Sequence, residues 1–124
     1  MKEILGVMMG GGLGALLRFG LCSWTKRCLA PGLPWGTLAV NVLGGFLIGF
    51  IATCPTLGLH RHPALRTTLI AGCLGGFTTF SAFSLETFQL ASAGSHGHAA
   101  LNAVANVALA LLATWLGTRV ALVW

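Results

Sequence analysis

The sequence predicts an all-α membrane protein with four transmembrane helices per chain. Of its 124 residues, 56% are hydrophobic and only 7% are charged, whereas soluble domains carry about 25% charged residues. The apolar residues form four stretches, each near the roughly 20 residues that cross a bilayer as a helix. Most of the 18 glycines fall inside these stretches, where they favour close helix packing. We therefore expect one four-helix domain over residues 1–124.

The four predicted helices follow one another with short loops between them. They cover residues 4–24, 35–53, 67–93 and 99–117. The second helix carries no charge and begins at Trp35, a residue type that anchors helices at the membrane interface. The third stretch is too long for one straight helix, and Gly75 with Gly76 predicts an interruption near its centre.

The basic residues bear on how the chain inserts. Four crossings place both termini and the second loop on one side of the membrane. The basic residues of that side are Lys2, Arg61, Arg66 and Arg119, and those of the other side are Lys26 and Arg27. This difference is a weak bias under the rule that basic loops stay in the cytoplasm. A weak bias permits insertion in both orientations and hence an antiparallel pair, although charge alone does not establish one.

Glycines recur at four-residue spacing on three of the predicted helices. They are Gly6, Gly10 and Gly14 on the first, Gly45 and Gly49 on the second, and Gly72 and Gly76 on the third. Such spacing lets helix backbones approach closely in lipid. A bundle packed this tightly has little room for a central pore, so we expect transport to use grooves shared with a second copy.

Several polar side chains lie at membrane depth, where they are costly and usually mark a pathway or a partner. Asn41, with Thr37 one turn before it, either ties two helices together or donates its amide N–H groups to a passing anion. Asn102, Asn106 and Thr114 share one face of the fourth helix. We expect the two asparagines to join helices and Thr114 to line a path.

Two charged residues also lie inside the predicted helices. Arg18 either extends to an interface or pairs with Glu86. A structural or vestibule position is favoured over direct conduction for Arg18.

The segment GGFTTFSAFSLE, residues 75–86, combines a break with hydroxyl groups and two aromatic rings. The hydroxyls can satisfy backbone groups that the break frees, and exposed carbonyl oxygens are ligands for hard cations. Phe80 and Phe83 share a helix face. A phenyl ring is positive around its edge, so an edge-on ring can face an anion.

Three motifs resemble, in order and spacing, the signatures of the Fluc (CrcB) fluoride channels. They are GGGLGALLRF at residues 10–19, NVLGGFLIG at 41–49 and GCLGGFTTFSAFSLE at 72–86. The resemblance implies an antiparallel, dual-topology homodimer in the bacterial cytoplasmic (inner) membrane. It also implies a channel that exports fluoride passively through two pathways at the dimer interface, and so lowers fluoride toxicity.

The resemblance further implies roles for individual residues. The fluoride pathway would comprise Asn41, Phe80, Phe83, Ser81, Ser84, Thr114 and Thr37. Arg18 and Glu86 would lie at the ends of the pathway. The backbone carbonyls of Gly75 and Thr78 would hold a structural sodium ion that is not transported. Two departures are Ala82, where many relatives have a threonine, and the absence of tyrosine.

A structural or assembly subunit would leave the hydroxyl groups of the predicted pathway without a purpose, and two further classes also fit the sequence less well than the channel. A small dual-topology, proton-coupled multidrug exporter would need a membrane-embedded acid, and only Glu86 is available. An enzyme or metal site would use the loop histidines His60, His62, His96 and His98, which no acid neighbours. We therefore expect no enzyme activity. The net charge of +5 is assigned to membrane topology and anion attraction rather than to nucleic acid.

Overall fold

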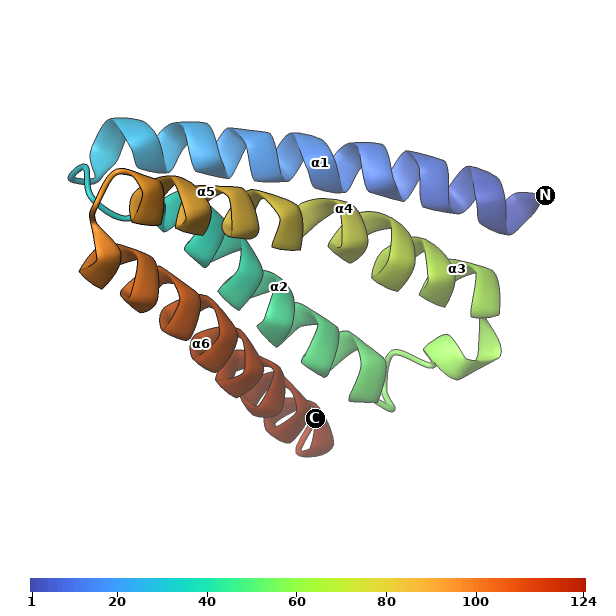
Figure 1. The fold of residues 1–124 in the computed structure, drawn as a ribbon. Coiled ribbons are helices and arrows are strands. Elements are labelled where there is room, and N and C mark those ends of the chain that lie inside the picture. The colour runs from blue at the N-terminus through green and yellow to red at the C-terminus, as the bar shows by residue number, and fades with distance from the viewer.

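The computed structural model describes residues 1–124, the side chain of Lys2 excepted. Four segments are long and apolar enough to cross a membrane, as predicted: Glu3–Cys28, Trp35–Thr53, Pro63–Ser92 and His96–Leu122. In the described chain the regular structure is entirely helical. The long helices are α1 (Lys2–Cys28), α2 (Trp35–Thr53) and α6 (His96–Leu122) (Figure 1). The protein is therefore a multi-pass, all-α membrane protein.

The third membrane-capable segment consists of several short helices in succession. A 3₁₀ turn at Leu59–Arg61 precedes it, and the segment comprises α3 (Pro63–Thr67), a π-helical stretch at Thr68–Leu74, α4 (Gly75–Phe77) and α5 (Phe80–Ser92). Thr78 and Thr79 between α4 and α5 have extended backbone, with ψ of 159° and 116°. Figure 1 shows α5 running at a changed angle after these residues, and α5 packs against α6 and α2 rather than against α1.

The extended residues lie three positions after the glycine pair at which we expected the interruption. Gly75 has ordinary helical angles, φ −62° and ψ −37°, and Gly76 belongs to the same short helix. A Cβ atom on Gly76 would clash with the backbone of Gly11 in α1. The glycine pair therefore permits close helix packing and does not itself provide the extended backbone.

Glycines form the close contacts of α1 with the third segment and of α2 with α6, as their spacing predicts. Gly10 and Gly14 of α1 face the backbone of the third segment around Thr68 and Cys73. On the other side, Gly49 of α2 lies against the backbone of Thr114 in α6. Each contact brings two backbones closer than a side chain would allow.

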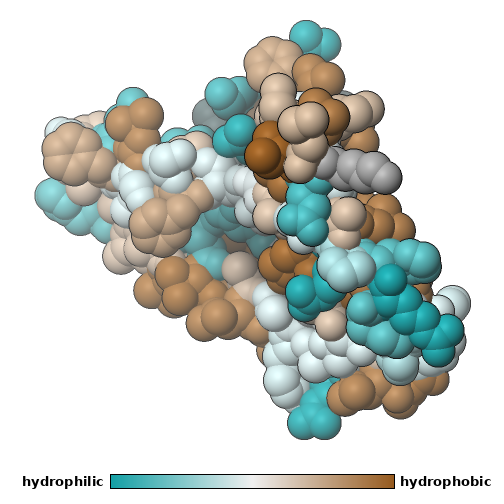
Figure 2. Space-filling view, turned by 90° about the vertical axis from the view of Figure 1, so that its right-hand side faces the viewer, coloured by the Kyte–Doolittle hydropathy of each residue, from teal (hydrophilic) through white to brown (hydrophobic). Residues whose placement is uncertain are grey.

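Both chain termini and the α2–α3 loop lie at one end of the bundle, as four crossings require (Figure 1). The loops after α1 and α5 lie at the other end. The side chain of Lys2 is outside the described part of the chain, but Arg61, Arg66 and Arg119 belong to the first end and Arg27 to the second. Figure 2, which faces the end that holds the termini, shows a hydrophilic group on one side of that end and apolar side chains over much of the remaining surface.

Replacing Gly14 by alanine should destabilise the bundle. The added Cβ would lie 2.8 Å from the Phe77 backbone nitrogen and closer still to the Cys73 carbonyl oxygen. Backbone atoms cannot move away as the end of a flexible side chain can. We therefore expect the free energy of unfolding to fall by about 1–3 kcal/mol, seen as a lower midpoint of thermal unfolding in detergent.

Gly12→Ala is the matched control, since no described atom lies within 4 Å of its added Cβ. Alanine there should leave stability unchanged or raise it by about 0.5–1 kcal/mol through helix propensity. Equal melting temperatures for the two variants would contradict the packing role assigned to Gly14.

Candidate functional site

The extended residue Thr79 is held by the side chain of Asn41 in α2. The Thr79 N–H donates to Asn41 Oδ1 at 2.9 Å, and Asn41 Nδ2 donates to the Thr79 carbonyl at 3.1 Å. The amide side chain thus pairs with the backbone of Thr79 much as a neighbouring strand would. In hydrocarbon both backbone groups need such a partner, so Asn41 makes the extended conformation possible at this depth.

Thr79 also caps α5. Its Oγ1 accepts a hydrogen bond from the Ala82 N–H at 3.1 Å, the contact typical of a helix N-cap. The hydroxyl of Ser81 lies 3.3 Å from the same oxygen. Thr79 is 7% exposed, and the start of α5 is therefore fixed by its buried hydroxyl.

A chain of amide hydrogen bonds continues from Asn41 into α6. Asn41 Nδ2 donates to Asn106 Oδ1 at 2.9 Å, and Asn106 Nδ2 donates to Asn102 Oδ1 at 3.0 Å. Asn102 Nδ2 then donates to the Thr87 hydroxyl of α5 at 2.8 Å. The two α6 asparagines are confirmed as ties between helices. The same contacts support the helix-tie interpretation of Asn41, and donation to an anion stays a prediction.

These side-chain contacts leave two backbone carbonyls without their usual helical donors. In a continuous helix the Gly75 carbonyl would accept from the Thr79 N–H, and the Thr78 carbonyl from the Ala82 N–H. Both N–H groups instead donate to side-chain oxygens, of Asn41 and of Thr79. Gly75 and Thr78 both line an open cleft. Carbonyl oxygens in this position have the chemistry of ligands for a hard cation.

That cleft, here called the phenylalanine cleft, holds both predicted aromatic residues. It has a volume of about 400 Å³ and is lined by Asn41, Gly75, Thr78, Phe80 and Phe83 among others. The two rings lie 5.2 Å apart between centroids, edge to face at 66°. Phe83 is 8% exposed, whereas Phe80 is 75% exposed at the open side. The ring pair therefore has one fixed member and one that faces outward.

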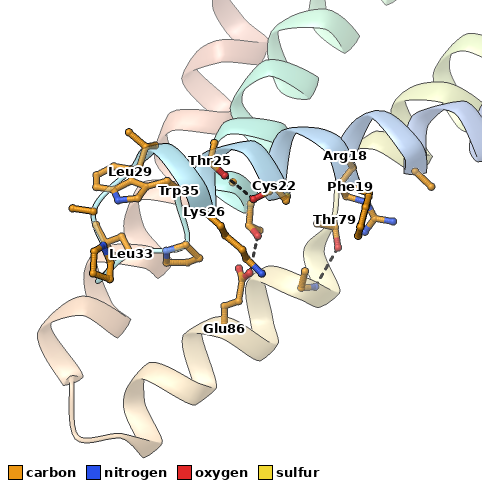
Figure 3. Close-up of a pocket in the computed structure, with 17 residues that line it drawn as sticks. Arg18, Phe19, Cys22, Thr25, Lys26, Leu29, Leu33, Trp35, Thr79 and Glu86 are labelled. Carbon is orange, nitrogen blue, oxygen red and sulfur yellow. Dashed lines mark hydrogen bonds between the residues drawn. The ribbon is translucent and has the colours of Figure 1, made fainter.

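A second cleft, here called the charged cleft, contains both predicted end residues (Figure 3). Its volume is about 790 Å³, and Arg18, Lys26, Thr37, Thr79 and Glu86 line it. Thr37 Oγ1 donates to Glu86 Oε1 at 2.9 Å. Glu86 Oε2 is buried without a hydrogen-bond partner in the described part of the chain. Figure 3 shows the Lys26 side chain reaching toward Glu86. The carboxylate is thus bonded to Thr37, and Arg18 shares its cleft without being its hydrogen-bond partner.

Three predicted pathway residues lie apart from the linings of these two clefts. Ser81 and Ser84 are exposed on α5, and the Ser84 hydroxyl donates to the Phe80 carbonyl at 2.9 Å. The Thr114 hydroxyl faces Gly45 in the α2–α6 contact, where a Cβ on the glycine would approach it to 3.0 Å. Within one chain, the structure therefore gathers Asn41, Phe80 and Phe83 but not these hydroxyls.

Three residues of the site were missed as site residues from sequence. Thr79 lines both clefts, Asn106 lines the phenylalanine cleft, and Lys26 lines the charged cleft. A threonine whose hydroxyl can accept a hydrogen bond from the backbone N–H three residues later is a typical N-cap residue. This signal could have identified Thr79 from the sequence. Lys26 sits in the last turn of α1 and was interpreted only as a topology residue.

Together, these observations define a multi-pass membrane protein with buried polar contacts beside open clefts. The chain matches the family described as CrcB-like protein, Camphor Resistance (CrcB), over residues 5–118. It therefore belongs to the CrcB family.

Curated relatives are similar over nearly their whole length. A protein named "Fluoride-specific ion channel FluC" from Thermus thermophilus is 47% identical, over 95% of this chain and 92% of that protein. Proteins of the same name from Geobacter sulfurreducens and Rhizobium leguminosarum bv. trifolii are each 44% identical. The Geobacter match covers 98% of both chains, and the Rhizobium match covers 97% of this chain and 96% of the relative.

Replacing Asn41 by aspartate should weaken the fold around Thr79. The substitution keeps the shape but turns the Nδ2 donor into an oxygen that faces the Thr79 carbonyl and Asn106 Oδ1. Leaving these acceptors unpaired should cost about 1–3 kcal/mol or more, measured as a lower midpoint of thermal unfolding.

Gln89→Glu provides the control for the amide-to-carboxylate change, because Gln89 is exposed on α5. It should melt close to the unmodified protein. The interpretation fails if Asn41→Asp melts no lower than Gln89→Glu.

Proposed function

We propose that this protein is a fluoride-selective ion channel that lets fluoride leave the cytoplasm passively across the bacterial inner membrane. The proposal depends on one observation above all: the chain is 44–47% identical in sequence, over more than nine-tenths of its length, to proteins named fluoride-specific ion channels. The pair of edge-to-face rings beside Asn41 in an open cleft supports it. Passive export would lower the toxicity of fluoride trapped inside the cell.

The chemistry of the clefts suits a small anion. Fluoride holds its hydration water strongly, so a selective path must replace that water with many weak donors. Ring edges carry positive charge, and Phe80 and Phe83, which pack edge to face, both line the phenylalanine cleft. Ser81 and Ser84 expose hydroxyls on the same helix. Asn41 would join by giving up its bond to Asn106 for the anion.

The charged cleft would be the entrance to this path. Arg18 and Lys26 supply positive charge there, and Thr37 with Glu86 lies beneath them. Thr79 lines both clefts, so an ion passing from one to the other would move past it. Thr114 would contribute to the path only from a second copy or after a movement of α6.

An antiparallel homodimer would complete the site. Phe80 is 75% exposed, and the cleft behind it is open on the side away from the bundle. A second, inverted copy would close each cleft and would produce two pathways at the shared interface. The weak charge asymmetry of the loops permits both orientations.

A structural sodium ion is the cofactor that the freed carbonyls fit. Gly75 and Thr78 offer two oxygens per chain, whereas hard cations are held by more oxygen ligands than two. Two chains would together supply four. When bound, such an ion would join the two third segments by electrostatic attraction and would not itself be transported.

The two alternative classes are not favoured. The relatives are named ion channels, which is consistent with a protein without enzyme activity and does not favour a drug exporter. Glu86, the acid that an exporter would need, accepts a hydrogen bond from Thr37 within the charged cleft.

Replacing Phe80 by isoleucine should reduce fluoride flux. Isoleucine keeps the apolar surface but removes the ring edge, and losing about 1.4 kcal/mol of anion stabilisation corresponds to about a tenfold drop. The measurement is fluoride efflux from liposomes that contain purified protein, compared with chloride efflux from matched liposomes.

Phe88→Ile is the matched control, since Phe88 is 69% exposed on the same helix but outside the lining of the phenylalanine cleft. Its flux should equal that of the unmodified protein. Chloride efflux as fast as fluoride efflux would refute the channel proposal itself. Full flux in both Phe80→Ile and Phe83→Ile would refute only the role of the rings.

Removing sodium should weaken assembly and flux together. When sodium is replaced by the organic cation N-methylglucamine, the proposed four-carbonyl site would be empty and its carbonyls would repel one another. We expect a smaller dimer fraction in cross-linking of liposome-embedded protein and slower fluoride efflux. A dimer fraction and flux indifferent to sodium would exclude the carbonyl site.

A further inference from the structure

A third cleft, here called the loop cleft, lies at the end of the bundle that holds both termini. It has a volume of about 600 Å³ and is formed by the end of α2, the following loop and the start of the third segment. Its polar lining residues are Thr53, Cys54, His60, Arg66 and Thr67. Because α2 ends at Thr53 and α3 begins at Pro63, the cleft lies where two membrane-capable segments leave the hydrocarbon.

The loop that forms this cleft is fixed by its own contacts. Gly58 has positive φ (58°), and its N–H donates to the Pro55 carbonyl at 3.1 Å to close a turn. Leu59 follows and is 7% exposed, so it anchors the loop against the bundle. A 3₁₀ turn over Leu59–Arg61 then carries His60 into the cleft lining, whereas Arg61 is not part of that lining. The cleft is therefore preformed by the fold.

The charge that lines the loop cleft is positive. Arg66 is cationic, and both the Arg66 and the His60 side chains are exposed. The chain has only two acids, Glu3 and Glu86, and neither is among the residues that line this cleft. A guanidinium group matches phosphate oxygens in a bidentate manner, and the threonine hydroxyls can donate to the same oxygens.

We propose that the loop cleft binds the phosphate group of an anionic phospholipid. A lipid is favoured over free phosphate because the cleft combines cationic and hydroxyl groups with apolar ones at the membrane boundary. Ile51 and Ala52, from the last turn of α2, contribute the apolar part of the wall. The phosphate would contact Arg66 and the hydroxyls, while the acyl chains would run along the apolar surface below. This site is independent of the fluoride pathway.

The test compares lipid binding to the full chain and to two variants with the same loss of charge. Arg66 lines the cleft, whereas Arg61, five residues earlier, does not. Binding of phosphatidylglycerol and of phosphatidylcholine to purified protein is measured by native mass spectrometry from detergent. We expect the unmodified protein to retain phosphatidylglycerol in preference, and R66Q to lower its affinity by about fivefold or more. R61Q should bind as the unmodified protein does.

Further arms separate the remaining explanations. R66K keeps the positive charge but loses the bidentate guanidinium donors, so it should recover part of the affinity. It also replaces R66Q in the comparison if R66Q does not fold. Equal losses in R61Q and R66Q would show diffuse surface charge and overturn the site. If inorganic phosphate alone displaces phosphatidylglycerol completely and protects the protein from thermal unfolding equally well, the ligand is a free phosphate and the lipid assignment is wrong.

Discussion

The structure depends on hydrogen-bond partners for the backbone of one extended residue, Thr79, at membrane depth. Hydrocarbon offers no hydrogen bonds, so a residue outside the helical pattern needs a partner for both backbone groups. Asn41 provides both to Thr79 from a helix 38 positions away in sequence. Without Asn41, the Thr79 N–H would form its most favourable hydrogen bond with the Gly75 carbonyl, and the third segment would continue as a helix. The direction of α5 and the freed Gly75 carbonyl follow from this pairing of the Asn41 side chain with the Thr79 backbone, whereas the Thr79 hydroxyl cap frees the Thr78 carbonyl.

The same pair links the site to the rest of the bundle. Asn41 is bonded to Asn106, and the amide chain returns through Asn102 to Thr87 on α5. The helix that carries the two phenylalanines is thus tied at its N-cap residue Thr79 and again at Thr87, about two turns later. Such doubly tied helices keep their orientation, which matters because an edge-on ring contact with an anion is weak and strongly directional.

The sequence predicted well what depends on local composition and spacing, and less well what depends on distant partners. Hydrophobic length predicted the four membrane-capable segments, and four-residue spacing predicted the glycine contacts. The extended residues fell at Thr78 and Thr79 rather than at Gly75 and Gly76, because a hydrogen bond from α2 decides their position. Thr114 shares a face with the asparagines, but its hydroxyl faces Gly45 and it does not line the phenylalanine cleft, although Gly45 itself does.

The tight glycine packing has a further consequence for where polar groups can go. Because α2 approaches α6 and α1 approaches the third segment at backbone distance, the bundle has no interior space for the carbonyls of Gly75 and Thr78. Both residues line the phenylalanine cleft. In hydrocarbon a backbone carbonyl without a hydrogen-bond donor costs several kcal/mol, so the two positions need a polar environment. The same close packing that stabilises the bundle therefore leaves Gly75 and Thr78 at the face where the proposed pathway lies.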